Sequence, residues 1–233
     1  MPKAGEDAEY CEDAIAAASD SVSHELRVAV ADGASSGSFS GVWARLLAMA
    51  FVNQAFSNAG DMASRLGPLA VAWSSDVFGR QLPWHALERA KRGAFSTIAG
   101  LAIGVDGHWR ATAIGDSCVF LIRENEVLKS FPLTRAEEFS NNPVLIASDP
   151  TKNDGLVATF RETDGHAKSG DMFLLATDAF SQFVIEYSNK GSDLRSMIAA
   201  LEGGRHAQTL VNANRRMDRL HNDDIAVVIV RVS

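Results

Sequence analysis

Four aspartates occupy positions at which an apolar segment meets a turn or a helix. They are Asp32 in V-A-V-A-D-G, Asp116 in A-I-G-D-S, Asp178 in L-L-A-T-D-A and Asp223 in N-D-D-I-A-V-V. A single Asp at such a position commonly forms a turn or caps a helix. If the four strands are neighbours, however, their carboxylates gather at one end of the sheets, where they raise one another's pKa unless a cation neutralises them.

The chemistry of these four side chains favours a particular class of metal ion. Oxygen ligands without a cluster of His or Cys select hard divalent ions such as Mg²⁺ or Mn²⁺. Two such ions about 3.5–4 Å apart are a recurrent device for hydrolysing phosphate esters. The aspartates therefore predict a metal-assisted phosphate-ester hydrolase.

Other reactive residue types give weaker signals. The six histidines have no mutual ligand spacing, and His221, two residues from Asp223, is the best placed to donate a proton. Cys11 and Cys118 lack metal-type spacing and fit a reducing compartment. The Ser- and Gly-rich segment 34–40 lacks the Lys-Ser/Thr pair of a P-loop, which indicates a plain turn.

The first half of the chain predicts elements that would carry these residues. Alternating apolar residues indicate a strand over 24–31 that ends at Asp32-Gly33, and helical spacing indicates helices over 40–57 and 84–94. Between these helices, Pro68 and the glycines in 60–79 indicate a helix end and a loop. An antiparallel meander is predicted from four short extended runs: 97–105, 109–114, 117–123 and 127–131.

In the second half of the chain, the sequence predicts a long loop followed by strands and helices. A long loop over 141–155 precedes strands and helices, and the chain closes on a β-branched run that reads as a strand buried on both faces. The predicted strands are 156–161, 171–177 and 225–232, and the predicted helices are 179–189, 193–201 and 205–220. Strands and helices in blocks, without a linker, indicate a layered α+β fold in one domain spanning 1–233.

Composition excludes several classes of protein. The 233 residues are 46% apolar, which is enough for a real core. Because 22 Lys and Arg face 29 Asp and Glu, for a net charge of −7, no nucleic-acid partner is expected. The sequence shows no signal peptide and no long apolar stretch, so we expect a cytoplasmic protein without a membrane partner.

Five segments, taken in order, resemble the metal-dependent type 2C protein phosphatase family, including a compact bacterial subgroup. Y-C-E-D-A at 10–14 resembles its N-E-D-A motif, and V-A-D-G-A-S-S-G at 30–37 resembles its D-G-x-G-G segment. A-I-G-D-S-C-V-F at 113–120, G-D-M-F-L-L-A-T-D-A-F at 170–180 and D-D-I-A-V-V-I-V at 223–230 resemble its G-D-S, G-D-x-L-L-L-x-S-D-G-L and D-N-x-T-x-V-V-V stretches. The resemblance extends from about residue 10 to 232.

This resemblance implies an αββα sandwich, in which two antiparallel sheets flanked by helices hold two Mn²⁺ or Mg²⁺ ions at their edge. Asp32 would bridge the ions and Gly33 would offer its backbone carbonyl to one of them. Asp178 and Asp223 would hold the other ion.

The remaining roles follow from the same resemblance. Glu12 and Asp13 would act mainly through metal-bound waters, and Asp116 matches a position associated with a weaker third ion. Asp32 and Asp13 are the expected catalytic residues, activating a bridging water for in-line attack on phosphorus. The substrate would be a protein phosphorylated on Ser or Thr by an opposing cytoplasmic kinase.

The chain also departs from the family pattern. Ala34-Ser35 looks like the D-G-A-S variant of the bacterial subgroup, Ala179 replaces a Gly, and Gln182 stands where many members carry a third-metal carboxylate. Asp223-Asp224 replaces D-N, so Asp223 is the expected ligand and Asp224 an outer-shell alternative.

The most serious departure is a missing arginine. No Arg precedes Glu12, where many members bind the substrate phosphate, so Lys3 or a basic residue near Lys152 would have to help. This leaves an alternative open, namely a phosphatase-fold protein with little or no turnover that binds phosphoproteins or regulates other proteins.

Overall fold

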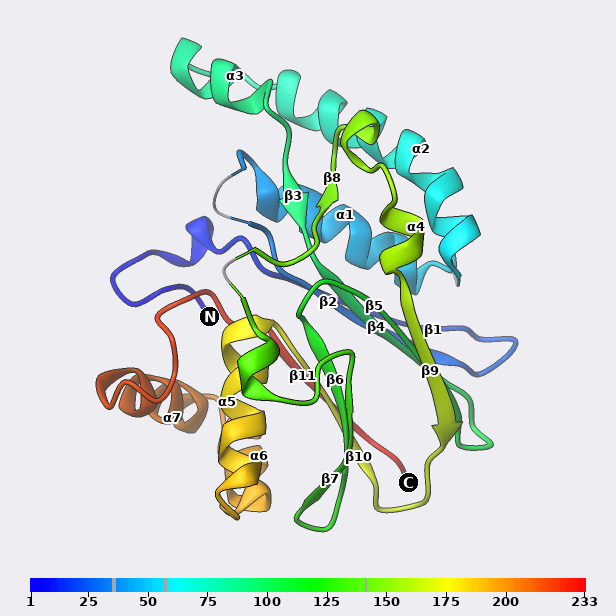
Figure 1. The fold of residues 1–233 in the computed structure, drawn as a ribbon, viewed down its shortest axis with the longest axis vertical. Coiled ribbons are helices and arrows are strands. Elements are labelled where there is room, and N and C mark those ends of the chain that lie inside the picture. Colours follow the sequence, from blue (N-terminus) through cyan, green and yellow to red (C-terminus); the bar gives the residue numbers. More distant parts are fainter. Residues whose placement is uncertain (35–36, 57, 141) are drawn as a thin grey trace.

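The computed structural model describes residues 1–34, 37–56, 58–140 and 142–233, and it has four layers (Figure 1). Two antiparallel sheets face each other, and helices cover the outer face of each. This arrangement confirms the predicted α+β class and the αββα sandwich.

The two large sheets are antiparallel throughout. The five-stranded sheet has the order β1 (Ala14–Ser19), β2 (Leu26–Ala31), β4 (Ile98–Ile103), β5 (His108–Ile114) and β9 (Arg161–His166). The four-stranded sheet has the order β11 (Val227–Arg231), β10 (Met172–Ala176), β6 (Cys118–Arg123) and β7 (Glu126–Phe131). A short pair joins β3 (Phe95–Ser96) to β8 (Ile146–Ala147).

Strand alternation divides the core into layers. On β2, Val28 and Val30 point between the sheets, where they share a cluster with Phe173 of β10. Ala29 and Ala31 point the other way, into the cluster formed with the helices. Each sheet therefore buries both faces, and its strand ends remain available for polar residues.

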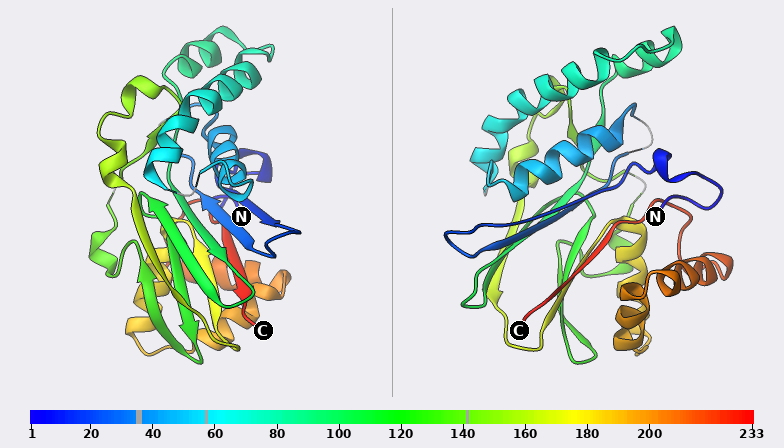
Figure 2. Two further views of the ribbon diagram at one scale, coloured as in Figure 1. Left: turned by 90° about the vertical axis from the view of Figure 1, so that its right-hand side faces the viewer. Right: turned by 180° about the vertical axis from the view of Figure 1, so that it is seen from behind.

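The helices lie on both outer faces (Figure 2). On the five-stranded side, α1 (Ser40–Val52) lies on β1 and β2, and α2 (Ala59–Phe78) packs on α1. On the other side lie α5 (Asp178–Asn189) and α6 (Leu194–Glu202), with α7 (Arg205–Arg216) against α6. The short helices are α3 (Trp84–Ala90) and α4 (Leu156–Thr159), and 3-10 turns cover Ala8–Tyr10, Ala136–Glu138 and Pro150–Lys152.

Helix α2 corrects the prediction of a loop over 60–79. Asn58 caps it by accepting a hydrogen bond from the Asp61 amide at 3.0 Å. Its buried residues Met62, Leu66, Trp73 and Val77 form one stripe, while Pro68 lies inside the helix and is exposed. Burial of this stripe outweighs the hydrogen bond that the proline removes.

The predicted meander is also wrong, because its four strands belong to two sheets. The β4–β5 hairpin lies in the five-stranded sheet and the β6–β7 hairpin lies in the four-stranded sheet. The chain crosses from one sheet to the other at Gly115-Asp116, which places this turn at the sheet ends.

Three further strand predictions need correction. The segment predicted as a strand over 156–161 forms helix α4, and the polar strand β9 follows it at the sheet edge. The last strand is not buried on both faces: β11 is an edge strand that pairs with β10, and most of its residues are half-buried. Strands β1, β3 and β8 were not predicted.

Helix ends differ by smaller amounts. Helix α1 ends at Val52, whereas the predicted end, Ser57, lies outside the described residues, as do Ser35, Ser36 and Asn141. Within the described ranges, no helix has the length and apolar character needed to cross a membrane.

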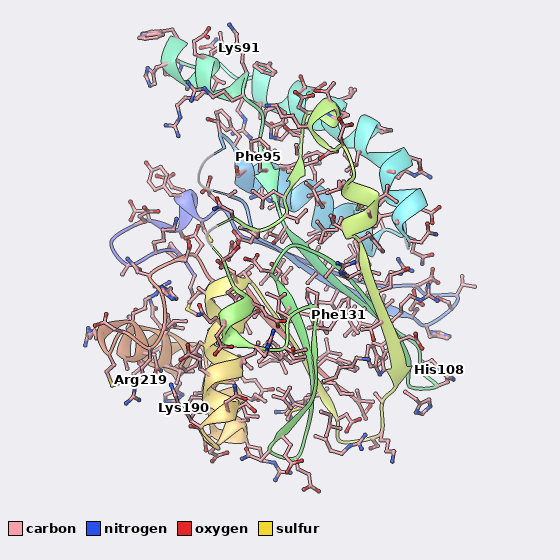
Figure 3. The ribbon with its side chains drawn as sticks, viewed as in Figure 1. Lys91, Phe95, His108, Phe131, Lys190 and Arg219 are labelled. Atoms are coloured by element: carbon pink, nitrogen blue, oxygen red, sulfur yellow. The ribbon has the colours of Figure 1, made fainter. Side chains whose placement is uncertain are left out.

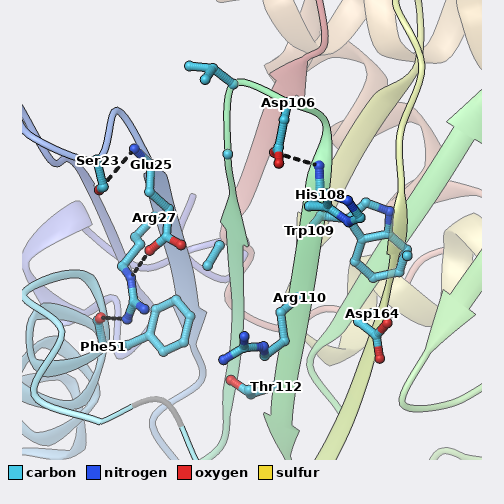
Figure 4. A pocket seen from close by; sticks show the side chains of 14 residues that line it. Ser23, Glu25, Arg27, Phe51, Asp106, His108, Trp109, Arg110, Thr112 and Asp164 are labelled. Carbon is cyan, nitrogen blue, oxygen red and sulfur yellow. Dashed lines mark hydrogen bonds and ion pairs between the residues drawn. The ribbon is translucent and has the colours of Figure 1, made fainter.

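Part of the outer face of the five-stranded sheet is left open beyond the end of α1. A pocket of about 680 Å³ lies there, lined by residues that include Arg27, Phe51, Arg110 and Asp164 (Figure 4). Arg27 donates to the Glu25 carboxylate at 2.6 Å and to the Phe51 carbonyl at 3.2 Å. The guanidinium is thus bound within the fold, and this pocket contains none of the predicted site residues.

Candidate active site

The register of the five-stranded sheet brings Asp13 and Asp32 together. Asp13 directly precedes β1 and Asp32 directly follows β2, and the neighbouring residues Ala14 and Ala31 are paired across the two antiparallel strands. The backbone carbonyl of Asp32 accepts from the Thr97 amide at 2.9 Å, which fixes the chain as it leaves the strand. The two predicted catalytic carboxylates therefore share one end of this sheet.

The four-stranded sheet brings three more aspartates to its own end. On β10, Ala176 pairs with Cys118 on one side and with Val227 on the other. Asp116 precedes β6, Asp178 begins α5 just after β10, and Asp223 lies in the turn before β11. These three carboxylates therefore lie at one end, and their charges act on one another.

The two groups of aspartates also meet each other. Thr177, the last residue before α5, donates its hydroxyl to Asp13 Oδ2 at 2.8 Å, which joins the four-stranded sheet to β1. The same Oγ1 accepts from the Ala226 amide at 3.0 Å. Sequence reasoning missed Thr177, although its place immediately before Asp178 was a usable signal.

Burial and mutual repulsion raise the pKa values of Asp13 and Asp32. Burial is the main cause of raising the pKa of Asp13 to about 7, and the hydrogen bond from Thr177 opposes the rise. For Asp32, burial again leads, followed by the charges of Asp13 and Asp178, and together they hold its pKa well above the usual range. Both carboxyls thus favour the neutral form when no cation is nearby.

Asp116 and Asp178 follow the same rule. Burial raises the pKa of Asp116 to about 7, and the charges of Asp178 and Asp223 add to the rise. Burial also raises the pKa of Asp178; a hydrogen bond from the Ala179 amide opposes this, Asp223 reinforces it, and the positive charge of His221 lowers it. His221 is exposed, and its effect on Asp178 is electrostatic.

Two buried carboxylate oxygens lack partners. Asp13 Oδ1 and Asp116 Oδ1 are inaccessible to solvent and accept no hydrogen bond within the described residues. Buried polar atoms are rarely left so, and an oxygen-only donor set suits Mg²⁺ or Mn²⁺. The donor chemistry therefore fits a divalent cation, although no three His, Cys, Asp or Glu side chains in the described ranges are arranged to hold a single ion.

Gly33 occupies a position with no room for a side chain. A Cβ there would lie 2.6 Å from the Glu12 carbonyl oxygen and 2.8 Å from the backbone of Ser40. Its backbone also forms an isolated bridge with Ser96. Close approach of three chain segments therefore explains the glycine after Asp32.

The two adjacent aspartates 223 and 224 have different roles. Asp224 is buried, and its two oxygens accept from the backbone amides of Lys3 and Glu12, at 2.9 and 2.8 Å. Asp223 is more exposed and pairs with the Lys3 ammonium at 3.1 Å. Asp224 thus fastens the N-terminal segment, and the expectation that Asp223 is the ligand stays a prediction.

Lys152 and Arg215 both donate to backbone carbonyls, in different parts of the fold. The side chain of Lys152 donates to the Arg92 carbonyl at 2.7 Å, so its ammonium is used within its own part of the fold. Arg215 donates to the Asp223 carbonyl and, at 3.0 Å, to the Pro2 carbonyl. Sequence reasoning did not find Arg215, because nothing local marks a helix residue that supports a distant turn.

Gln182 cannot act as a carboxylate. Its side-chain amide donates to the Ala136 carbonyl at 3.4 Å, across from α5 to the 3-10 turn at 136–138. This contact connects two surface elements and leaves the expected third-metal carboxylate without a replacement at position 182.

Comparison with solved structures shows the fold. A crystal structure of RsbX in complex with magnesium has a TM-score of 0.53 at 17% identity, covering 100% of this chain and 92% of that one. A bacterial serine phosphatase has a TM-score of 0.63 at 11% identity, covering 100% and 95%. The serine/threonine phosphatase Stp1 from Staphylococcus aureus has a TM-score of 0.62 at 12% identity, covering 100% and 93%.

The sequence comparisons differ in what they find. None of the curated proteins matches this chain. The protein phosphatase 2C family, in contrast, matches residues 4–214, which include four of the five aspartates described above. With this match, the shared fold and the converging carboxylates, the chain belongs to the protein phosphatase 2C family.

Proposed function

We propose that this protein is a Mg²⁺- or Mn²⁺-dependent phosphatase of phosphoserine and phosphothreonine in proteins. The observation that carries the proposal is the convergence of five aspartates from the ends of two sheets, two of them with buried oxygens that lack partners. Such a cluster is costly in a metal-free fold, since like charges and burial both oppose ionisation. In a phosphatase that binds divalent cations, the cations would offset this free-energy cost, which agrees with the match to a phosphatase family.

The proposed ligands follow the residues of the cluster. Asp32 would bind both ions, and the Gly33 carbonyl would bind one of them. Asp178 and Asp223 would bind the other ion, and Asp13 would act from the side of β1. Asp116 would contribute to a weaker third position. Two bound divalent ions would supply an activated water and neutralise charge that develops on the phosphoryl group.

The chain's own residues have a positioning task in this proposal. Thr177 holds Asp13 by a hydrogen bond that crosses from one sheet to the other. Asp224 holds the amide of Glu12 and so fixes the segment that leads into Asp13. These contacts keep the carboxylates of both sheets in one place before a substrate arrives.

The expected setting follows from the family. Its members act on phosphorylated proteins, and we propose a cytoplasmic phosphoprotein substrate whose phosphate is added by a Ser/Thr kinase. Nothing in the net charge of −7 favours a nucleic-acid partner.

The direct experiment is hydrolysis of an aryl phosphate and of a phosphoserine peptide, each with added Mn²⁺ and with a chelator. We expect turnover that depends on the ion. Undiminished turnover in the chelator would contradict the metal-dependent mechanism, and no turnover of either substrate with Mn²⁺ or Mg²⁺ would contradict the enzymatic proposal.

A second candidate is a phosphoprotein-binding module with little turnover. The glutamine at 182 and the lack of an arginine before Glu12 favour it, because both remove groups that many members use. Saturable binding of a phosphopeptide without its hydrolysis, measured in the same buffers, would support this candidate over the enzyme.

A further inference from the structure

A groove of about 450 Å³ lies beside the carboxylates. Four segments that are distant in sequence form it: the N-terminal segment, the turn before α1, the short helix α3 and the turn before β11. Its polar lining includes Lys3, Glu12, Ser38, His85, Arg89 and Asp224. This groove is separate from the pocket around Arg27, with which it shares no lining residue.

The groove is continuous with the aspartate cluster. Glu12 is the neighbour of Asp13, and Asp224 is the neighbour of Asp223. Lys3 lines the groove while its ammonium lies 3.1 Å from Asp223. A chain bound with one residue at the aspartates would therefore have its flanking residues in or beside this groove.

Two basic side chains on α3, His85 and Arg89, line the groove without a carboxylate partner among the described residues. His85 and Arg89 are four residues apart and so share a helix face. Both are exposed, and neither side chain makes a hydrogen bond or an ion pair with any described residue; His85 makes only an edge contact with the Trp84 ring. By contrast, Lys91, which directly follows α3, forms an ion pair with Glu88 at 2.5 Å.

The acidic residues of the groove do not lie on α3 with His85 and Arg89. Asp224 is buried and already accepts two backbone amides, and Glu12 belongs to the segment that those bonds fasten. Glu6 is exposed on the N-terminal side of the groove. The side formed by α3 is therefore cationic, and an arginine there offers several unused donors that suit a carboxylate or phosphate.

We infer that this groove reads the residues that flank the phosphorylated Ser or Thr, and that Arg89, with His85, selects acidic side chains at a flanking position. The inference rests on the proposed function, since it takes the aspartate cluster as the place of the phosphoryl group. Charge complementarity is its basis: an acidic flank meets unpaired cations on a protein whose net charge is negative. Contacts between the groove and the flanking residues would also strengthen the binding of protein substrates, which is useful in a chain that has no arginine before Glu12.

The test uses three phosphoserine peptides that differ only in their flanks, which carry Asp, Asn or Lys on both sides. With Mn²⁺ present, we expect kcat/KM for the Asp peptide to exceed that for the Asn peptide by about tenfold, and the Lys peptide to be poorest. Arg89→Glu should abolish or reverse this order. Its kcat/KM for a small aryl phosphate, which has no flanks, should stay within about twofold of the wild type.

Lys91→Glu is the matched control, because it makes the same charge change on the same helix end outside the groove lining. It should retain the preference for acidic flanks. Equal kcat/KM for the three peptides in the wild type, or an unchanged order in Arg89→Glu, would overturn the inference. So would loss of the preference in both variants, since this would indicate long-range charge alone.

A binding readout separates this inference from the proposed function. If the wild type hydrolyses neither the aryl phosphate nor the peptides, the enzymatic proposal fails, and fluorescence anisotropy of the same labelled peptides tests the groove. Tighter binding of the Asp peptide that is lost in Arg89→Glu would support the groove. Equal binding of the three peptides would overturn it.

Discussion

Strand β2 connects two regions that treat charge in opposite ways. Near its start, Arg27 is buried and bound to Glu25 and to the Phe51 carbonyl, on the open outer face of the sheet (Figure 4). Just beyond its end, Asp32 lies among like charges, and the nearby Asp13 has a buried oxygen with no partner. One region satisfies its charges internally, and the other does not.

The difference indicates which region serves the fold and which serves chemistry. A buried charge with partners within the chain holds segments together, and removing one partner is costly. A buried cluster of one sign opposes folding and persists where an external cation or substrate completes it. The buried Arg27 therefore serves the fold, and the aspartate cluster is the region that we propose for chemistry. Ion pairs within the chain also occur elsewhere, between Arg80 and Asp76 at 3.1 Å and between Arg231 and Glu202 at 2.8 Å. Figure 3 shows the side chains of the described residues over the whole fold.

The largest expected effect comes from removing one anion of the cluster. Asp32→Asn, and likewise Asp178→Asn, should lower kcat for an aryl phosphate by at least about a hundredfold to a thousandfold, because each change removes a proposed ligand. Steady-state kinetics with saturating Mn²⁺ measures this loss. Asp164→Asn, which changes the same residue type in the other pocket, should retain the wild-type kcat, and near-normal turnover by Asp32→Asn would refute its role.

Metal binding should affect stability as well as activity. Mn²⁺ at about 100 times its dissociation constant stabilises the protein by about 2.7 kcal/mol, which corresponds to a rise in Tm of about 5–10 °C. Thermal unfolding with and without a chelator measures this rise. It should shrink in Asp32→Asn and remain in Asp164→Asn; an identical rise in both variants would mean that the ion binds elsewhere.

The paired region should show the reverse pattern. Arg27→Leu leaves Glu25 and the Phe51 carbonyl without this donor, which should lower the free energy of unfolding by about 1–3 kcal/mol. Because Arg27 lies away from the aspartates, kcat should not change. Chemical denaturation measures the loss of stability, and kinetics on the same sample measures kcat. A lower kcat in a folded variant would show that the Arg27 region contributes to activity and would contradict the comparison.

The smallest expected effect is a change in the pH dependence of stability. The folded-state pKa of Asp116 is about 7, above its ordinary 3.8, so the folded protein binds a proton there that the unfolded chain does not. The free energy of unfolding of the metal-free protein should therefore fall as pH rises from 3.8 to about 7. Asp116→Asn should reduce this slope, and Asp13, also at about 7, should maintain the remainder.

Denaturant titrations of the metal-free protein at several pH values measure that slope. Asp164→Asn serves as the control and should leave it as in the wild type. Stability that rises with pH over this interval would contradict the proposed repulsion among the carboxylates.

Regular burial patterns explain which elements the sequence predicted. In β2 the large apolar residues share the face between the sheets, and in α5 the apolar residues follow the buried side of the helix, so local sequence was sufficient. Helix α2 was missed because Pro68 is a strong local signal, whereas its stabilising stripe becomes visible only when α1 lies beneath it. Strand β9 was missed because it is a polar edge strand whose partner, β5, sets its conformation.

The candidate site divides in the same way. The aspartates could be found because each lies next to an apolar strand in a short, ordered motif. Thr177 and Asp224 act through bonds to Asp13, Lys3 and Glu12, which are far away in sequence. His85 and Arg89 had no local signal at all, because a groove between four separate segments exists only in the folded chain.

The hydrogen bonds that Asp224 accepts from the backbone amides of Lys3 and Glu12 have a consequence for biosynthesis. During translation, β2 and Asp32 leave the ribosome long before residue 224 exists, so the emerging chain then holds two of the five aspartates of the cluster without the other three. Closing this contact joins segments more than two hundred residues apart, a step that local folding cannot take early. Under the proposed function, a chain stalled before the turn that precedes β11 would lack Asp223 and Asp224 and so could not complete the carboxylate cluster.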